Sequence, residues 1–189
     1  MRLATPSDAN NLSALATQVF LHTYGTEGVT DDLSTFVLQA FAPDAFLRTL
    51  GDASSAIVVE EFDGGLIAFS ELAFDVPCPD DPCVTTEITR FYVQEHFTRT
   101  GIGTRLLDAS VRLARGRTGS AGLWLSVYAG NPAALAFYRS QGFEQVGTCW
   151  FELDSASHEN YVLLLNETAG VRRGEHRTSA STRRAIGLG

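Results

Sequence analysis

The segment Thr98-Arg99-Thr100-Gly101-Ile102-Gly103 has the composition of a turn that can hold a phosphate group. It follows a β-branched and aromatic run from Ile88 to Val93, which predicts a strand, and it precedes a helical pattern. Glycines let an anion approach the backbone, and a helix N-terminus adds aligned N–H donors. The turn is not a dinucleotide fingerprint, because Leu106 stands where a third glycine is required, and no Gly-Lys-Ser/Thr follows to make a nucleotide P-loop.

A second segment places an amide and a phenol on one short helix. A predicted strand from Leu123 to Tyr128 leads to Asn131-Pro132, and the following helix carries Phe137 and Tyr138 before Gly142-Phe143. Asn before Pro is typical of a helix N-cap. Together the two segments resemble the GNAT acetyltransferase superfamily, whose members move an acetyl group from acetyl-CoA to an amine. The resemblance spans roughly residues 1 to 166.

The resemblance implies where acetyl-CoA, the cosubstrate, binds. In the family the phosphate turn reads Gln/Arg-x-x-Gly-x-Gly/Ala, and this chain departs from it with Thr98 at the first position and Arg99 where glycine is common. Backbone amides supply most of such a cradle, so we expect binding to be kept, with Arg99 and Arg105 supplying positive charge. By resemblance, backbone groups of the strand contact the pantetheine arm. The residues expected to bind the cofactor are Tyr92, Val93, Thr98, Arg99, Thr100, Gly101, Ile102, Gly103, Thr104, Asn131, Phe137 and Tyr138.

Tyr138 stands where the family places the catalytic acid. Acetyl transfer needs a neutral amine, a hydrogen-bond donor for the oxyanion and a proton for the leaving thiolate. A phenol with a pKa near about 10 can protonate a thiolate whose acid has a pKa near about 8.5. Phe137 and Tyr138 cannot both face the core on one helix, so one of them is expected to face the cofactor. The backbone N–H near Val93 is the implied oxyanion donor.

Glu87 is the leading candidate for the general base. It lies 14 residues before Gly101, the offset of the glutamate base in histone-type members of the superfamily. Strand alternation predicts that Glu87 shares a face with Phe91 and Val93 and therefore faces the cleft. Glu71 on the neighbouring strand is an alternative base, although it could equally be a solvated residue at the edge of the sheet without a role in the reaction. A chain of water molecules is a third possibility for the base.

The early helices indicate a class of acceptor. Phe20, Tyr24 and the segment from Asp31 to Pro43 resemble the PaiA-like branch, which acetylates polyamines, and we expect a small cationic amine as the substrate. Tyr24, Glu27 and Glu71 are the expected acceptor pocket. The alternatives are a protein or peptide amine, an amine antibiotic, or a non-catalytic acyl-CoA-binding domain, for which the Thr98 departure is the best support.

The composition limits the classes of molecule that the chain is expected to bind. Residues 1–169 hold 9 arginines against 21 acidic residues, a formal charge of −12 that disfavours nucleic acid and attracts cations. The three cysteines, Cys78, Cys83 and Cys149, form no metal-ligand set, so we expect reduced thiols and no metal. No signal peptide or membrane span is apparent, which predicts a cytoplasmic protein without a membrane partner. Members of the family often form dimers, so the resemblance implies a possible homodimer.

The elements that carry these residues are predicted from periodicity and turn signals. A helix follows Thr5-Pro6-Ser7-Asp8, a second runs from Asp31 to Ala40, and a third starts at Pro43. The later elements are strands 56–62, 66–74, 87–93, 123–128, 144–153 and 160–165, and helices 101–115 and 132–141. This order predicts an α/β fold with a mixed, mostly antiparallel sheet and flanking helices. The resemblance implies that the fold is of the GNAT type, with a parallel strand pair splayed at the cofactor cleft. The resemblance implies that residues 1–169 form the acetyltransferase domain, and we expect the Arg-rich tail 170–189 to be disordered.

Overall fold

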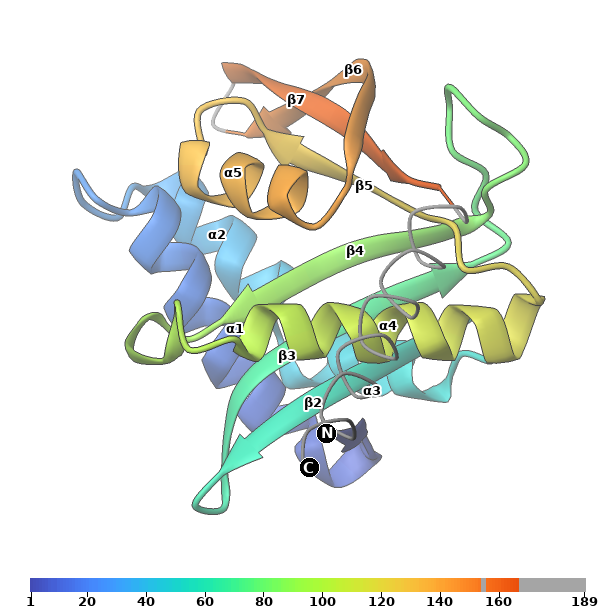
Figure 1. Cartoon of the computed structure of the whole chain (residues 1–189). Helices are drawn as coiled ribbons and strands as arrows, with labels where there is room; N and C mark the ends of the chain where they lie inside the picture. The colour runs from blue at the N-terminus through green and yellow to red at the C-terminus, as the bar shows by residue number, and fades with distance from the viewer. Residues whose placement is uncertain (154–155, 167–189) are drawn as a thin grey trace, which may run out of the picture.

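A computed structural model describes residues 1–153 and 156–166. Its centre is a seven-stranded sheet with the order β1-β2-β3-β4-β5-β7-β6 (Figure 1). The strands are β1 (Arg2–Leu3), β2 (Ser55–Phe62), β3 (Gly65–Phe74), β4 (Thr86–Val93), β5 (Leu123–Tyr128), β6 (Glu144–Leu153) and β7 (Ala156–Leu165). Every pairing is antiparallel except β4 with β5. The predicted mixed, mostly antiparallel α/β fold is therefore confirmed.

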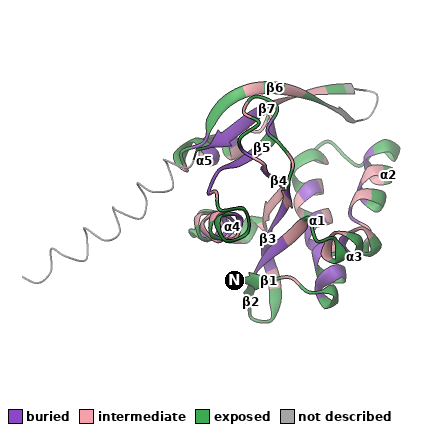
Figure 2. Ribbon diagram, turned by 90° about the vertical axis from the view of Figure 1, so that its right-hand side faces the viewer, coloured by how far each residue is buried: buried purple, intermediate pink, exposed green. Residues whose placement is uncertain are grey.

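The helices divide between the two faces of the sheet. They are α1 (Ala9–Tyr24), α2 (Asp31–Ala40), α3 (Pro43–Gly51), α4 (Ile102–Thr118) and α5 (Pro132–Ser140), with 3-10 turns at Pro6–Asp8 and Glu95–Phe97. Figure 2 shows α4 and α5 on one face and α1 to α3 on the other. Each face buries its own apolar cluster, since Leu106 of α4 belongs to one and Phe20 of α1 to the other. The sheet thus separates two compartments.

Local signals in the sequence explain most of the element boundaries. At the β2–β3 turn, Asp63 and Gly64 both have positive φ, at 50° and 78°, which is the geometry of a primed hairpin turn. The Thr30 side chain accepts a hydrogen bond from the Leu33 N–H and caps α2. The two-residue strand β1 was not predicted because it is too short to show a period.

A one-residue bulge divides β4 into two parts. Glu71 of β3 pairs with Arg90, whereas the next residue, Leu72, pairs with Ile88, so Thr89 is the extra residue. A bulge of this kind shifts the alternation of side chains along the strand. Residues of β4 before and after Thr89 therefore do not follow a single odd–even pattern.

The parallel strands β4 and β5 meet at one residue pair. Glu87 lies opposite Trp124, and no further β4–β5 pair forms among the described residues. Beyond this point β4 stays paired with β3 and β5 with β7, each on its outer edge. The two strands therefore splay apart toward Val93 and Tyr128, as the family resemblance implied.

Within the described ranges, every helix is too short or too polar to serve as a membrane span. The predicted domain boundary at residue 169 and the tail 170–189 lie outside the described residues.

Candidate active site

The gap between β4 and β5 exposes backbone groups that can bind a ligand. Backbone groups of successive residues point to opposite edges of a strand. Because the Gln94 N–H donates to the Ile67 carbonyl of β3, the backbone groups of Tyr92 also point to β3, whereas those of Val93 point to the gap. Buried backbone N–H and C=O groups need partners, and an extended ligand arm with amide groups can supply them. Of the two residues for which the resemblance implied backbone contacts to a cofactor, Val93 directs its backbone groups to the gap and Tyr92 directs them to β3.

The loop before α4 presents free backbone donors. Arg99 and Gly101 adopt left-handed conformations, with φ of 60° and 83°, which fold the chain sharply before the helix begins at Ile102. Within the described part of the chain, the Arg105 N–H donates to the Gly101 carbonyl, and no intramolecular acceptor is found for the N–H groups of 99–104. Unpaired N–H groups at a helix N-terminus are suited to an anion. The positive φ of Arg99 also explains why glycine is common there in the family.

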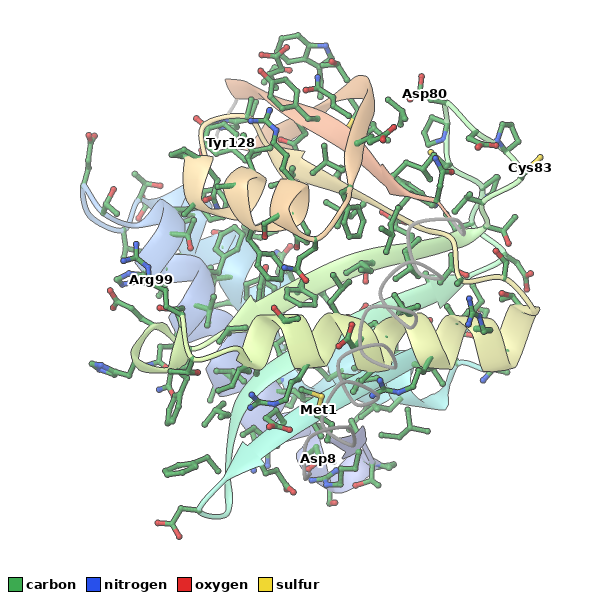
Figure 3. The ribbon with its side chains drawn as sticks, in the orientation of Figure 1. Met1, Asp8, Asp80, Cys83, Arg99 and Tyr128 are labelled. Atoms are coloured by element: carbon green, nitrogen blue, oxygen red, sulfur yellow. The ribbon has the colours of Figure 1, made fainter. Side chains whose placement is uncertain are left out.

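The side chains of this loop mostly support the loop itself. The hydroxyls of Thr98 and Thr100 donate to the carbonyls of Glu95 and Phe97, at 2.8 and 2.6 Å. Arg99 is exposed (Figure 3), whereas Arg105 lies 3.3 Å from Glu60. Thr98 thus stabilises the turn through its own hydrogen bond. Its side chain takes the place of the Gln or Arg of the family motif without supplying charge.

Gly103 has a packing role besides its expected cofactor role. A Cβ at Gly103 would lie 3.2 Å from the Phe137 ring, which stacks on Phe91 with centroids 5.7 Å apart. Ile102 is buried in the core, and Thr104 is half-buried on the first turn of α4. The first turn of α4 therefore touches α5 directly, and glycine permits that close approach.

Asn131 and Tyr138 lie on α5, on the same face of the sheet as α4. The Asn131 Oδ1 accepts a hydrogen bond of 3.0 Å from the Ala134 N–H, which confirms the predicted N-cap. Its amide NH₂ group is the end that can donate to a ligand. Tyr138 is only 7% exposed and packs between Phe91 and Phe143. Of the pair that cannot both be buried, Phe137 is the half-exposed member.

Burial raises the pKa of Tyr138 well above that of a free phenol, and the neighbouring Tyr92 and Tyr24 raise it further. Burial is also the main cause of the raised pKa of Tyr92 and of Tyr24. Tyr138 consequently stays protonated at physiological pH, as a proton donor must, but it is a weaker acid than a free phenol.

Glu87 lies on the other face of the sheet. It is opposite Ala73 of β3, whereas Phe91 is opposite Ser70, and cross-strand partners point to the same side. The expectation that Glu87 shares a face with Phe91 and Val93 is therefore wrong, because the Thr89 bulge shifts the alternation. Burial, together with the nearby Glu71 carboxylate, raises the pKa of half-buried Glu87. A carboxylate with a raised pKa is a better base near neutral pH.

Glu71 is held in a buried ion pair. Its carboxylate lies 2.6 Å from the Arg90 guanidinium, which also donates to the Ala40 carbonyl and stands over the rings of Phe41 and Phe46. Glu71 is 8% exposed, so its interpretation as a solvated edge residue is wrong. The pair ties β3 and β4 to the α2–α3 junction, which makes Glu71 a weaker candidate for the base than Glu87.

The predicted acceptor residues are only partly brought together. Tyr24, the last residue of α1, reaches the ring of Tyr128 at the end of β5, with centroids 6.0 Å apart. Glu27 is exposed in the loop that follows α1. Tyr128 and its neighbour His158 were not predicted, and the only sequence signal for them was an aromatic residue at the end of a strand.

The sequence matches the acetyltransferase (GNAT) family over residues 22–143. The chain belongs to this family. The N-alpha-acetyltransferase RimI of Mycobacterium tuberculosis (strain ATCC 25618 / H37Rv) is 30% identical over 143 residues, which are 76% of this chain and 77% of that protein. The resemblance drawn from the sequence is confirmed, and the protein is an acetyltransferase.

Solved structures show the same fold. PaiA N-acetyltransferase from Thermoplasma acidophilum, in complex with coenzyme A, has a TM-score of 0.71 at 18% identity, covering 87% of this chain and 96% of that one. Mutant forms of the spermidine/spermine N-acetyltransferase SpeG from Vibrio cholerae give 0.62 at 14% identity, covering 91% and 96%. A ribosomal-protein-alanine N-acetyltransferase from Brucella melitensis gives 0.65 at 23% identity, covering 87% and 98%.

GNAT enzymes use acetyl-CoA, which supplies an acetyl group activated as a thioester. The residues of this GNAT protein fit such a cosubstrate, because the loop 99–104 offers unpaired N–H groups and β4 offers the unpaired backbone groups of Val93. No group of three His, Cys, Asp or Glu side chains suited to a metal occurs among the described residues.

Proposed function

We propose that this GNAT protein transfers the acetyl group of acetyl-CoA directly to the primary amine of a small cationic molecule, such as a polyamine, in a ternary complex. One observation carries the proposal: the residues proposed for the chemistry lie on the two faces of the sheet, beside the place where β4 and β5 lose their pairing. Tyr138 and the loop 99–104 belong to the side of α4 and α5, and Glu87 belongs to the side of α1. Donor and acceptor can therefore approach the gap from opposite faces.

Each residue then has a separate role. Glu87 removes a proton from the incoming ammonium group, directly or through a water molecule. The backbone N–H near Val93 donates to the carbonyl oxygen as negative charge develops there. Tyr138 gives its proton to the departing sulfur. Asn131 orients the cofactor arm through its amide NH₂ group, while its Oδ1 caps α5.

The charge of the chain supports a cationic acceptor. Residues 1–169 carry a formal charge of −12, and a field of that sign raises the local concentration of a cationic amine. A second candidate acceptor is the α-amine of a protein N-terminus. It is favoured by the 30% identity with an N-alpha-acetyltransferase over 76% of the chain.

The test is CoA thiol release from acetyl-CoA across a panel of amines: spermidine, spermine, aminoglycosides, amino acids, a lysine peptide and peptides with a free N-terminus. Release with spermidine or spermine supports the proposal, whereas release only with N-terminal peptides selects the second candidate. If no amine reacts and acetyl-CoA still raises the melting temperature, the chain acts as a binding domain for this panel. If acetyl-CoA causes no thermal shift either, the assignment of the cofactor site is wrong.

A further inference from the structure

The open end of the β4–β5 gap is bordered by Tyr128. It is the last residue of β5 and lies opposite Asn160 of β7. Trp124, at the closed end, lies opposite Leu164, and Val162 belongs with Leu164 and Trp124 to one cluster on this face. Since residues two apart on a strand share a face, Tyr128 points to the side of Trp124, away from α5. This is the side on which the proposed acceptor enters.

Gly130 permits the position of this ring. A Cβ at Gly130 would lie 2.5 Å from the Tyr128 Cε1 and 2.8 Å from its hydroxyl oxygen, a separation that real structures do not contain. Gly130 has no positive φ, so its backbone conformation is open to any residue. Glycine at this position leaves room for the tyrosine ring to fold back over it, and a Cβ there would displace the ring.

Two further contacts hold the ring from the other sides. The His158 ring of β7 meets it edge to face, with centroids 5.6 Å apart and planes at 85°. Tyr24 meets it at 6.0 Å and is itself anchored on Phe20 at 4.5 Å. Helix α1 packs on the half of the sheet that ends in β4, and β5 begins the other half. The Tyr24–Tyr128 contact therefore joins the two halves on the acceptor side.

We propose that Tyr128 is a specificity-determining residue, which with Tyr24 narrows the acceptor entrance so that it favours an amine on an unbranched carbon chain. The inference rests on the proposed acetyl transfer and adds the reason for its selectivity. An unbranched alkylammonium can pass along aromatic ring faces and gain cation–π attraction from them. The α-amine of a peptide carries a side chain and a carbonyl on the adjacent carbon, and both must clear the same two rings.

The test compares kcat/KM for spermidine with kcat/KM for an alanine-terminated peptide. Wild type favours spermidine. Tyr128→Ala widens the entrance, and Gly130→Ala displaces the ring without changing it, so each lowers the ratio by about tenfold, the usual scale for loss of one well-placed apolar contact. Tyr128→Phe keeps the ring and keeps the ratio. Gly116→Ala on α4, where a Cβ meets nothing within 4 Å, is the matched glycine control and leaves the ratio unchanged.

An unchanged ratio in both Tyr128→Ala and Gly130→Ala overturns the inference, and so does a wild-type preference for the peptide. If wild type acetylates neither probe, the proposed acceptor class fails, and the entrance is tested by binding alone. Spermidine and the peptide are then titrated calorimetrically into the complex with CoA. A changed ratio of affinities in Tyr128→Ala, but not in Gly116→Ala, supports the inference. Equal ratios, or no binding of either probe, overturn it.

Discussion

Replacement of Tyr138 by Phe separates its chemical role from its packing role. The ring keeps its neighbours Phe91 and Phe143, so the fold should be retained. Loss of a general acid costs about 10²- to 10⁴-fold in rate. Because burial raises the pKa of Tyr138 and makes it a weaker acid, we expect the lower end of that range. The expected loss in kcat is about 10²-fold, or about 2.7 kcal/mol of activation free energy.

The assay is CoA thiol release with saturating amine and varied acetyl-CoA. The hydroxyl is the only group removed, so the KM for acetyl-CoA should change by no more than about twofold. Tyr161→Phe on β7 is the control, because its ring packs against the same apolar cluster and it has no proposed role in the reaction. An unchanged kcat in Tyr138→Phe, or an equal fall in the control, would refute the reasoning. A melting temperature well below that of wild type would assign the loss to the fold.

Three other substitutions test the electrostatics and the core. Glu87→Gln should lower kcat by at least about 10²-fold at pH 7. Because the folded pKa of Glu87 is raised, its ionised form costs stability, so this variant should melt higher than wild type at pH 8 and equally below pH 4.5; the opposite order in a thermal scan contradicts the buried carboxylate. Asp8→Asn should cost about 1 kcal/mol at pH 7 in a urea titration, because Asp8 accepts from Thr5 and Arg2. The Asp8 pKa is lowered, so its contribution is present above the unfolded value of 3.8 and is lost as the pH falls below it; a difference independent of pH would argue against the ion pair. Ser70→Ala should raise stability by about 1 kcal/mol, since the buried Ser70 hydroxyl has no partner within the described chain. Ser110→Ala, which removes a hydroxyl bonded to the Leu106 carbonyl, should not be stabilising, and an equal gain in both would dismiss this explanation.

Sequence patterns predict the elements well where the period is long and both ends are marked. The strands Leu123–Tyr128 and Glu144–Leu153 and the helix Asp31–Ala40 have the predicted bounds. Asn131-Pro132 gives the start of α5 because a cap and a proline at the first helical position are both local signals. The glycine-rich turn before α4 is likewise recognised from neighbouring residues alone.

The acceptor side is less predictable because it depends on how neighbouring strands pair and on contacts between residues far apart in the sequence. The run from Ile88 to Val93 looks regular, and nothing in it marks Thr89 as an inserted residue, so the face of Glu87 was assigned wrongly. The Arg90–Glu71 pair joins residues 19 positions apart, and a single sequence does not reveal such partners. Gly130 resembles an ordinary turn glycine until the ring of Tyr128 is seen above it.

The single pairing of Glu87 with Trp124 also has a mechanical consequence. The two parts of the sheet, β1 to β4 and β5 to β7, are joined by hydrogen bonds at this pair. At the other end of the gap they are connected by aromatic contacts such as Tyr24–Tyr128. A ligand that hydrogen-bonds to the free edges of both strands supplies the hydrogen bonds that β4 and β5 do not make with each other. Its binding should therefore slow amide hydrogen exchange in β4 and β5 together, although the strands themselves hardly touch.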